Sequence, residues 1–131
     1  YVTIASTGNV TYFGDLYQLA TAPAGFSSST RGVFAGGDSN VASLNVIQYI
    51  TIATMGNSVD FGDLTAIRTL AVGVSSQITG LIGGGYVSGI LSSNIQYITI
   101  ASTGNSASFG SLIGSSNSYF GGSSSGGGGL Q

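Results

Sequence analysis

The six charged residues are the side chains with the clearest capacity for chemistry: Asp15, Asp38, Asp60, Asp63, Arg31 and Arg68. Asp60 and Asp63 flank Phe61, and two similar segments of the chain have Asp15 and Ser111 at the position of Asp63. A ring of such oxygens, supplied by several loops, could hold a calcium ion. The alternative is that each Asp side chain accepts hydrogen bonds from backbone amides in a turn. We favour the turns and predict no metal site, because no segment has the ligand density of a calcium-binding loop.

The residue types that most enzymes need are missing. The chain has no His, Cys, Lys or Glu, whereas general acid–base catalysis near neutral pH most often uses His, and a nucleophilic Ser needs a neighbouring base. Asp60 and Asp63 could in principle form the carboxylate pair of a glycosidase, but they are close in sequence and no Trp accompanies them. We therefore predict a protein with no catalytic residues and no cofactor, and keep a sugar-processing enzyme only as an outlier.

One short phrase recurs three times at a constant spacing. It reads "YVTIASTGN" at 1–9, "YITIATMGN" at 49–57 and "YITIASTGN" at 97–105, and "FGDL" or "FGSL" follows each copy. This predicts tandem 48-residue repeats at 1–48 and 49–96, with a partial third at 97–131 that ends in a Gly/Ser-rich tail. Such units bury their faces by stacking on one another. Recurring positions such as Tyr49, Phe61 and Asp63 are therefore predicted to be structural.

Within one repeat the pattern predicts short antiparallel strands and an all-β fold. Residues 49–54 alternate and are rich in β-branched side chains, which is typical of a strand, and 58–64 would be the returning strand. Gly and Asn between them tolerate positive φ, as a tight hairpin turn needs. We expect turns near Gly8-Asn9, Gly56-Asn57 and Gly104-Asn105, and further strands at 68–76 and 80–86.

Glycine doublets follow two of the apolar runs, and their members are Gly36, Gly37, Gly84 and Gly85. We interpret them as places where the backbone passes close to a neighbouring strand and a Cβ would clash. A phosphate-binding loop would need a following Lys-Ser or Lys-Thr, or a βαβ context, and the sequence has neither.

The order of these features resembles the kelch repeat: "RGVFAGG" at 31–37, "NVIQYITIA" at 45–53, and "DFGDLTAIR" at 60–68. The amino-acid sequence of these segments is also similar to that of kelch-like tandem repeats in predicted marine bacteriophage proteins. The resemblance implies β-propeller blades, or stacked β-repeats, in which these residues are mostly structural. It differs in the absence of Trp, and Arg68 has Ala20 and Ser116 at its matching positions.

Composition restricts the partners. Charged residues make up 5% of the chain, the net charge is −2 and Lys is absent, so a phosphate-neutralising surface for nucleic acid is excluded. The longest apolar stretch, 81–91, is too short to span a bilayer. A surface with so little charge does little to keep copies apart, which favours a homo-oligomer. The first residue is Tyr1 rather than Met, which indicates a processed product, a fragment or a numbering limited to the ordered part.

These observations leave three functions open. The first is a non-enzymatic structural or adhesive component of a virion or extracellular appendage. The second is a self-assembling extracellular filament subunit, and the outlier is a glycan-binding or glycan-processing propeller. Aromatic residues that do not recur could contact a cell-surface glycan or protein, namely Tyr12, Tyr17 and Tyr86. If one unit runs from 20 to 64 and the next from 68 to 112, we expect the 1–16 hairpin to pair with the C-terminal strands of another copy, in a ring or an open filament. The alternative is that these residues are an excerpt from a longer chain whose further blades complete the ring.

Overall fold

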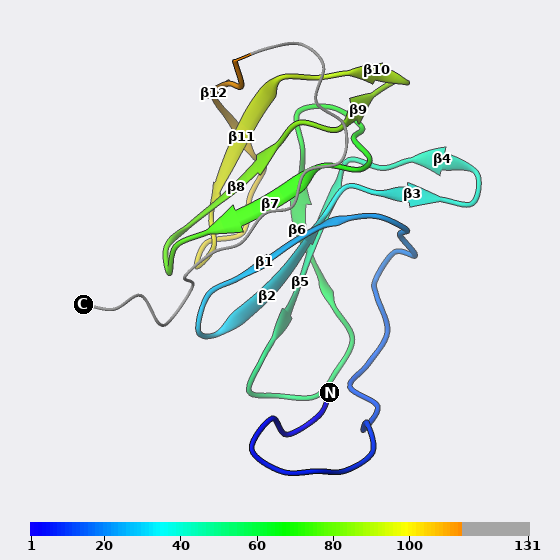
Figure 1. Cartoon of the computed structure of the whole chain (residues 1–131), viewed down its shortest axis with the longest axis vertical. Helices are drawn as coiled ribbons and strands as arrows, with labels where there is room; N and C mark the ends of the chain where they lie inside the picture. Colours follow the sequence, from blue (N-terminus) through cyan, green and yellow to red (C-terminus); the bar gives the residue numbers. More distant parts are fainter. Residues whose placement is uncertain (114–131) are drawn as a thin grey trace.

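The computed structural model describes residues 1–113, and this part of the chain is all-β with no helix. Its main elements are two four-stranded antiparallel sheets (Figure 1). The first has the order β1-β2-β5-β6, with strands at Ala24–Ser27, Arg31–Ala35, Val46–Thr51 and Val59–Asp63. The second has the order β7-β8-β11-β12, with strands at Val72–Ser75, Thr79–Gly83, Asn94–Thr99 and Ala107–Ser111. Neither sheet closes into a barrel.

A two-stranded hairpin projects from each sheet between its second and third strands. It comprises β3 (Asp38–Ser39) and β4 (Ala42–Ser43) in the first sheet, and β9 (Tyr86–Val87) and β10 (Ile90–Leu91) in the second. Figure 1 shows the β3–β4 hairpin extending sideways from the body of the molecule. Each strand of the second sheet begins at the same position of the repeated sequence as its counterpart in the first, as Val72 matches Ala24 and Asn94 matches Val46.

The register of the two sheets also matches position by position. Val33 pairs with Tyr49 in the first sheet, and Leu81 pairs with Tyr97 in the second. A register shift after Ile47 recurs after Ile95, where the third strand meets the fourth. Two segments of similar sequence therefore adopt the same local pairing, bulge included.

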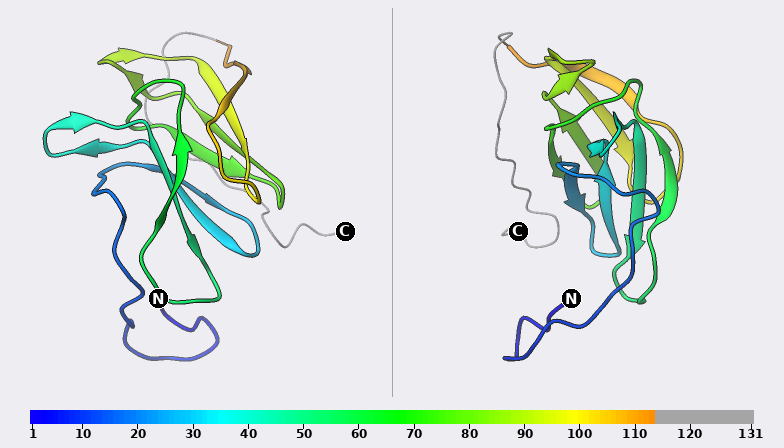
Figure 2. Two further views of the ribbon diagram at one scale, coloured as in Figure 1. Left: turned by 180° about the vertical axis from the view of Figure 1, so that it is seen from behind. Right: turned by 90° about the vertical axis from the view of Figure 1, so that its right-hand side faces the viewer.

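The apolar core lies between the two sheets, which approach each other along β1 and β7. Alternate side chains of the first sheet point into it, among them Val33, Ala35 and Ile47, and the second sheet contributes Ile82, Ile98 and Ile100. The ring of Phe26 occupies the space that the missing side chains of Gly73 and Gly80 leave open. Full burial of a side chain of this size stabilises the fold by about 1.5–3 kcal/mol. The two views in Figure 2 show the sheets stacked against each other.

The predicted strands at 49–54, 58–64, 68–76 and 80–86 are present, but three boundaries were wrong. The strand expected at 68–76 is β7, Val72–Ser75, which begins later because Leu70 has a φ of 55°. The strand expected at 49–54 is β5, Val46–Thr51, which begins earlier because Ile47 and Gln48 already pair with β2. The strand expected at 80–86 is interrupted, because Gly84 and Gly85 have φ values of 67° and 77° that break the pleat. Tyr86 belongs to the next strand, β9.

The hairpins expected near Gly56-Asn57 and Gly104-Asn105 are confirmed as β5–β6 and β11–β12, but the tight Gly-Asn turn was wrong. The chain reverses across the whole of 52–58, where Thr54 N donates to Thr51 O at 3.2 Å. Gly56 has a φ of 153°, whereas Asn57 is not among the residues with positive φ. The recurring Gly-Asn pair therefore lies at the end of the connection, where its Asn side chain accepts a hydrogen bond from another segment of the chain.

The N-terminal segment, residues 1–19, lies beside the β5–β6 connection (Figure 1). The backbones of Tyr1 and Thr11 bond to each other in both directions, at 2.6 and 2.8 Å, just where Tyr49 faces Val59 in the first sheet. The strand hairpin expected at 1–16 was wrong, because no strand forms before Ala24. The expected pairing of 1–16 with C-terminal strands of another copy concerns positions beyond 113, which lie outside the described residues, as does Ser116.

Candidate functional site

The same pattern of backbone hydrogen bonds joins the N-terminal segment to the first sheet and the first sheet to the second. Gly56 N donates to Phe13 O at 2.8 Å, and Ser58 N donates to Asp15 O at 2.9 Å. At the second contact Gly104 N donates to Phe61 O at 2.7 Å, and Ser106 N to Asp63 O at 2.9 Å. We call residues 13–15 and 61–63 the FGD segments, and residues 56–58 and 104–106 the GNS turns. The set of hydrogen bonds between a segment and its turn is called the FGD–GNS contact.

The Asn side chain completes each contact. Asp15 N donates to Asn57 Oδ1 at 2.9 Å, and Asp63 N donates to Asn105 Oδ1 at the same distance. The Asn oxygen takes the place of a backbone carbonyl, so each FGD segment is bonded on its amide and carbonyl sides as if to a neighbouring strand. Gly is required in the segment, since a Cβ on Gly62 would lie 2.5 Å from the Gly104 carbonyl oxygen.

Behind each GNS turn, a buried glutamine holds the serine. Ser58 Oγ donates to Gln48 Oε1 at 2.7 Å, and Ser106 Oγ donates to Gln96 Oε1 at 2.5 Å. Gln48 Oε1 also accepts from Gln18 N, and Gln48 Nε2 donates to Gln18 O at 2.8 Å. A neutral hydrogen bond of this kind contributes about 1 kcal/mol, and more is lost when a buried partner remains unsatisfied. Sequence reasoning missed both glutamines, although their recurrence at one position of the repeated sequence was a signal.

The aspartates take part mainly through their backbone. Asp15 and Asp63 bond to the GNS turns by N and O, so the side-chain bonds to amides that we expected of aspartate are made by Asn57 and Asn105 instead. The Asp15 carboxylate interacts with Tyr12, and this hydrogen bond, more than burial or charge repulsion, raises the pKa of the Tyr12 hydroxyl. Within residues 1–113 no three acidic, His or Cys side chains gather into a group that could hold a metal ion.

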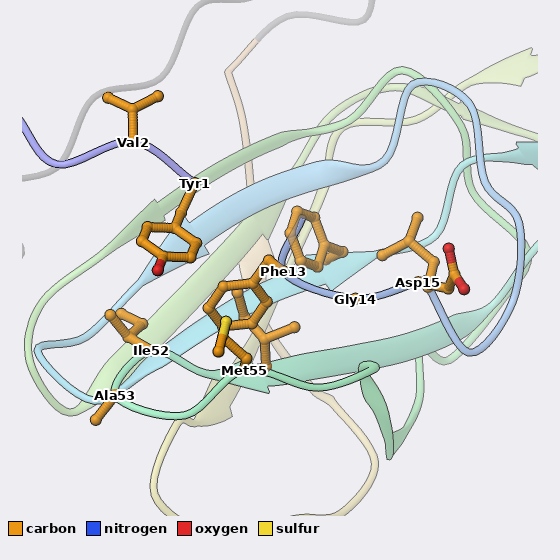
Figure 3. Close-up of a pocket in the computed structure, with 11 residues that line it drawn as sticks. Tyr1, Val2, Phe13, Gly14, Asp15, Ile52, Ala53 and Met55 are labelled. Carbon is orange, nitrogen blue, oxygen red and sulfur yellow. The ribbon is translucent and has the colours of Figure 1, made fainter. Parts of the chain in front are cut away.

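An apolar cleft lies between the N-terminal segment and the first sheet. Its volume is about 720 Å³. Figure 3 shows Tyr1 and Phe13 from the N-terminal segment together with Ile52, Ala53 and Met55 around this hollow. Phe34 and Ile50 line its wall on the sheet.

The cleft has a filled counterpart between the two sheets. Ile98 and Ile100 occupy the positions of the repeated sequence that Ile50 and Ile52 hold 48 residues earlier. They are 3% and 1% exposed because they lie in the core with side chains of β1 and β2, whereas Ile52 is 45% exposed.

Arg68 joins the glycine doublets of the two sheets. Its guanidinium donates to Gly84 O at 2.6 Å and to Asn94 O at 2.9 Å, while its own carbonyl accepts from Gly37 N at 2.8 Å. Burial lowers the pKa of Arg68, which is 2% exposed. A Cβ on Gly36 would collide with the Arg68 carbonyl, and one on Gly85 with that of Thr69. These glycines permit a close backbone approach. Arg68 thus has a structural role, because its hydrogen bonds connect the two sheets.

The aromatic residues fall into two groups. Tyr49 and Phe61 meet edge to face with ring centroids 5.8 Å apart, and the pairs Tyr1–Phe13 and Tyr97–Phe109 repeat this at 6.0 and 6.2 Å. The candidate ligand contacts are elsewhere: Tyr12 and Tyr17 are exposed on the N-terminal segment, and Tyr86 is half-buried at the start of β9. The structure does not bring these three into the apolar cleft.

Neither a protein-family model nor a curated protein matches the sequence. The kelch resemblance therefore stays a prediction. Residues 1–113 contain no helix with the length and apolar character needed to cross a membrane.

Proposed function

We propose that the chain is a non-enzymatic structural protein whose four-stranded units stack head to tail, and that it builds a virion or extracellular appendage by associating with further copies of itself. The site that does this work is the inter-unit surface, formed by the FGD–GNS contact and the apolar faces beside it.

The observation that carries the proposal is the difference between Phe61 and Phe109. The two residues occupy the same position in successive copies of the repeated sequence. Phe61 is 3% exposed because the second sheet covers it, whereas Phe109 is 62% exposed. A face that one unit buries against the next is left open on the second sheet, and an open apolar face is typical of an association surface.

The first sheet has an uncovered apolar surface of the complementary kind, on the side that faces away from the second sheet. The apolar cleft exposes Ile52 where Ile100 is covered by the preceding sheet. The chain thus carries both halves of one interface on different surfaces. Interfaces of this heterologous kind generate closed rings or open filaments, according to whether the rotation between copies closes.

Two features support an interpretation of the sheets as propeller blades. Each is a four-stranded antiparallel sheet with its strands in chain order around an inserted hairpin, and the sheets approach through their first strands, β1 and β7. Blades of a propeller meet in this manner around an axis, and closure takes about four to eight of them. The matching strand bounds of the two sheets support tandem repeats as their basis.

Sedimentation velocity of the full chain over a range of concentrations tests the proposal, with electron microscopy to distinguish rings from filaments. We expect species larger than a monomer, and we expect Phe109→Ser to shift the distribution towards the monomer. Val41→Ser is the matched control, because Val41 is 92% exposed at the tip of the β3–β4 hairpin, away from the stack. A wild-type chain that stays monomeric at every concentration would contradict the proposal.

A further inference from the structure

The FGD–GNS contact occurs twice within the described residues, and the sequence contains a third copy of each half. The third turn is Gly8-Asn9-Val10, and the third segment is Phe109-Gly110-Ser111. All six residues are exposed. Within residues 1–113, no hydrogen bond joins either half to a partner of the FGD–GNS kind.

The unoccupied turn differs from the occupied ones in its backbone. Gly56 and Gly104 have φ values of 153° and 152°, whereas Gly8 is not among the glycines with positive φ. The segment that carries Gly8 forms no strand, but the Tyr1–Thr11 backbone bonds hold its two ends together where Tyr49 and Val59 pair in the first sheet. The positive φ thus accompanies an FGD segment in place, and Gly8 is the residue type that can adopt it on docking.

The unoccupied segment keeps the residues that the contact uses, although Gly110 is not among the glycines with positive φ, whereas Gly14 and Gly62 have φ values of 156° and 144°. Asp15 and Asp63 bond to the turns through backbone N and O, so Ser111 can replace aspartate without loss of a bond. Gly110 keeps the glycine at the position where Gly62 passes the Gly104 carbonyl, and open space surrounds Gly110 itself. Phe109 remains edge to face with Tyr97, as Phe61 is with Tyr49.

We propose that Phe109-Gly110-Ser111 of one copy docks on Gly8-Asn9-Val10 of a second copy and reproduces the FGD–GNS contact between chains. Gly8 N then donates to Phe109 O, Val10 N donates to Ser111 O, and Asn9 Oδ1 accepts from Ser111 N. The partner is a second copy because the same chain carries both halves, and the segment of one copy followed by the turn of the next repeats the segment-before-turn order of the internal contacts. This inference rests on the proposed self-association and assigns its register.

Cysteine pairs test the register, since the chain has no cysteine of its own. An Asn9→Cys variant is mixed with an isotope-labelled Ser111→Cys variant under mildly oxidising conditions, and the disulfide-linked species are weighed. The internal pair Asp15→Cys with Asn57→Cys is the positive control for geometry, because Asp15 N lies 2.9 Å from Asn57 Oδ1. A mixture of Asn9→Cys with Val41→Cys is the negative control.

The expected result is a heterodimer in excess over both homodimers, with no such excess in the Val41→Cys mixture and an intramolecular disulfide in the internal pair. If the chain sediments as an oligomer and the internal pair closes, but the heterodimer is absent, the register is wrong while self-association stands. A chain that remains monomeric in sedimentation overturns both.

Discussion

The side-chain oxygen of Asn57 accepts a hydrogen bond of 2.9 Å from the backbone amide of Asp15, which lies 42 residues earlier in the chain. Asn105 and Asp63 repeat the bond at the same length and the same separation. Two segments of similar sequence thus make the same hydrogen bond to a residue that precedes them by 42 positions.

Removal of the asparagine side chain should weaken each occupied contact. We expect Asn57→Ala and Asn105→Ala each to lower the free energy of unfolding by about 1 kcal/mol, because the Asp15 or Asp63 amide loses its acceptor. The control is Asn9→Ala, which should leave the stability of the monomer unchanged because Asn9 lies in the unoccupied turn. Urea unfolding at a concentration where the chain is monomeric measures all three. Equal losses at the three positions would show that asparagine acts on its own turn rather than on the neighbouring unit.

Alanine substitution at two glycines distinguishes the destabilisation caused by backbone strain from the destabilisation caused by a steric clash. Gly62 and Gly56 have φ values of 144° and 153°, so an added methyl group strains both backbones, at about 1–3 kcal/mol each. Only Gly62 also faces an obstacle, the Gly104 carbonyl at 2.5 Å from the new Cβ, whereas Gly56 has no heavy atom within 4 Å. Gly62→Ala should therefore be less stable than Gly56→Ala by a further ~1–3 kcal/mol. Matching urea midpoints for the two variants would rule out the close approach as a requirement.

The buried arginine should stabilise the joint between sheets more than the half-buried one. Arg68→Ala removes bonds to Gly84 O and Asn94 O and leaves a cavity, so we expect a loss of about 3 kcal/mol or more. Arg31→Ala removes one bond to Ile100 O and the stacking of the guanidinium 4.4 Å from the Tyr49 ring centroid, for about 1–2 kcal/mol. Thermal and urea unfolding rank the two variants, and the reverse order would place the main joint at Arg31.

The sequence allowed the strands to be predicted because strand periodicity and a regular repeat are local signals. Alternation around Tyr49 identified a strand to within a few residues, whereas Gly84 and Gly85 were placed inside a predicted strand that their positive φ values interrupt. Exact ends could not be predicted, since the start of β5 depends on its pairing with β2. That pairing is set by tertiary contacts that no local pattern encodes.

The inter-unit contact was not predictable in the same way. Gly56-Asn57 has the composition of a tight turn, and only the structure shows that the Asn57 side chain accepts a hydrogen bond from the Asp15 amide of the N-terminal segment. Gln48 and Gln96 are buried, against the usual preference of glutamine for the surface, because each binds a serine hydroxyl of its own sheet's turn. Exposure of Phe109 likewise depends on what lies next to the second sheet, whereas its sequence context matches that of buried Phe61.

Phe61 and Phe109 offer the most direct comparison of a covered and an uncovered face, because they share one sequence position and one kind of aromatic neighbour. Phe61→Ala should lower the free energy of unfolding of the monomer by about 3–5 kcal/mol, since the ring is buried between the sheets and its loss leaves a cavity. Phe109→Ala should change it by less than about 0.5 kcal/mol, since that ring is mostly in solvent. The order of the two variants should reverse in a mixing experiment: Phe109→Ala should reduce incorporation into wild-type assemblies, whereas any folded fraction of Phe61→Ala should still be incorporated. Urea unfolding of dilute protein and sedimentation of the mixtures measure the two effects. A large loss of monomer stability from Phe109→Ala would mean that its ring is already covered within one copy, and the open face would then be on another part of the second sheet.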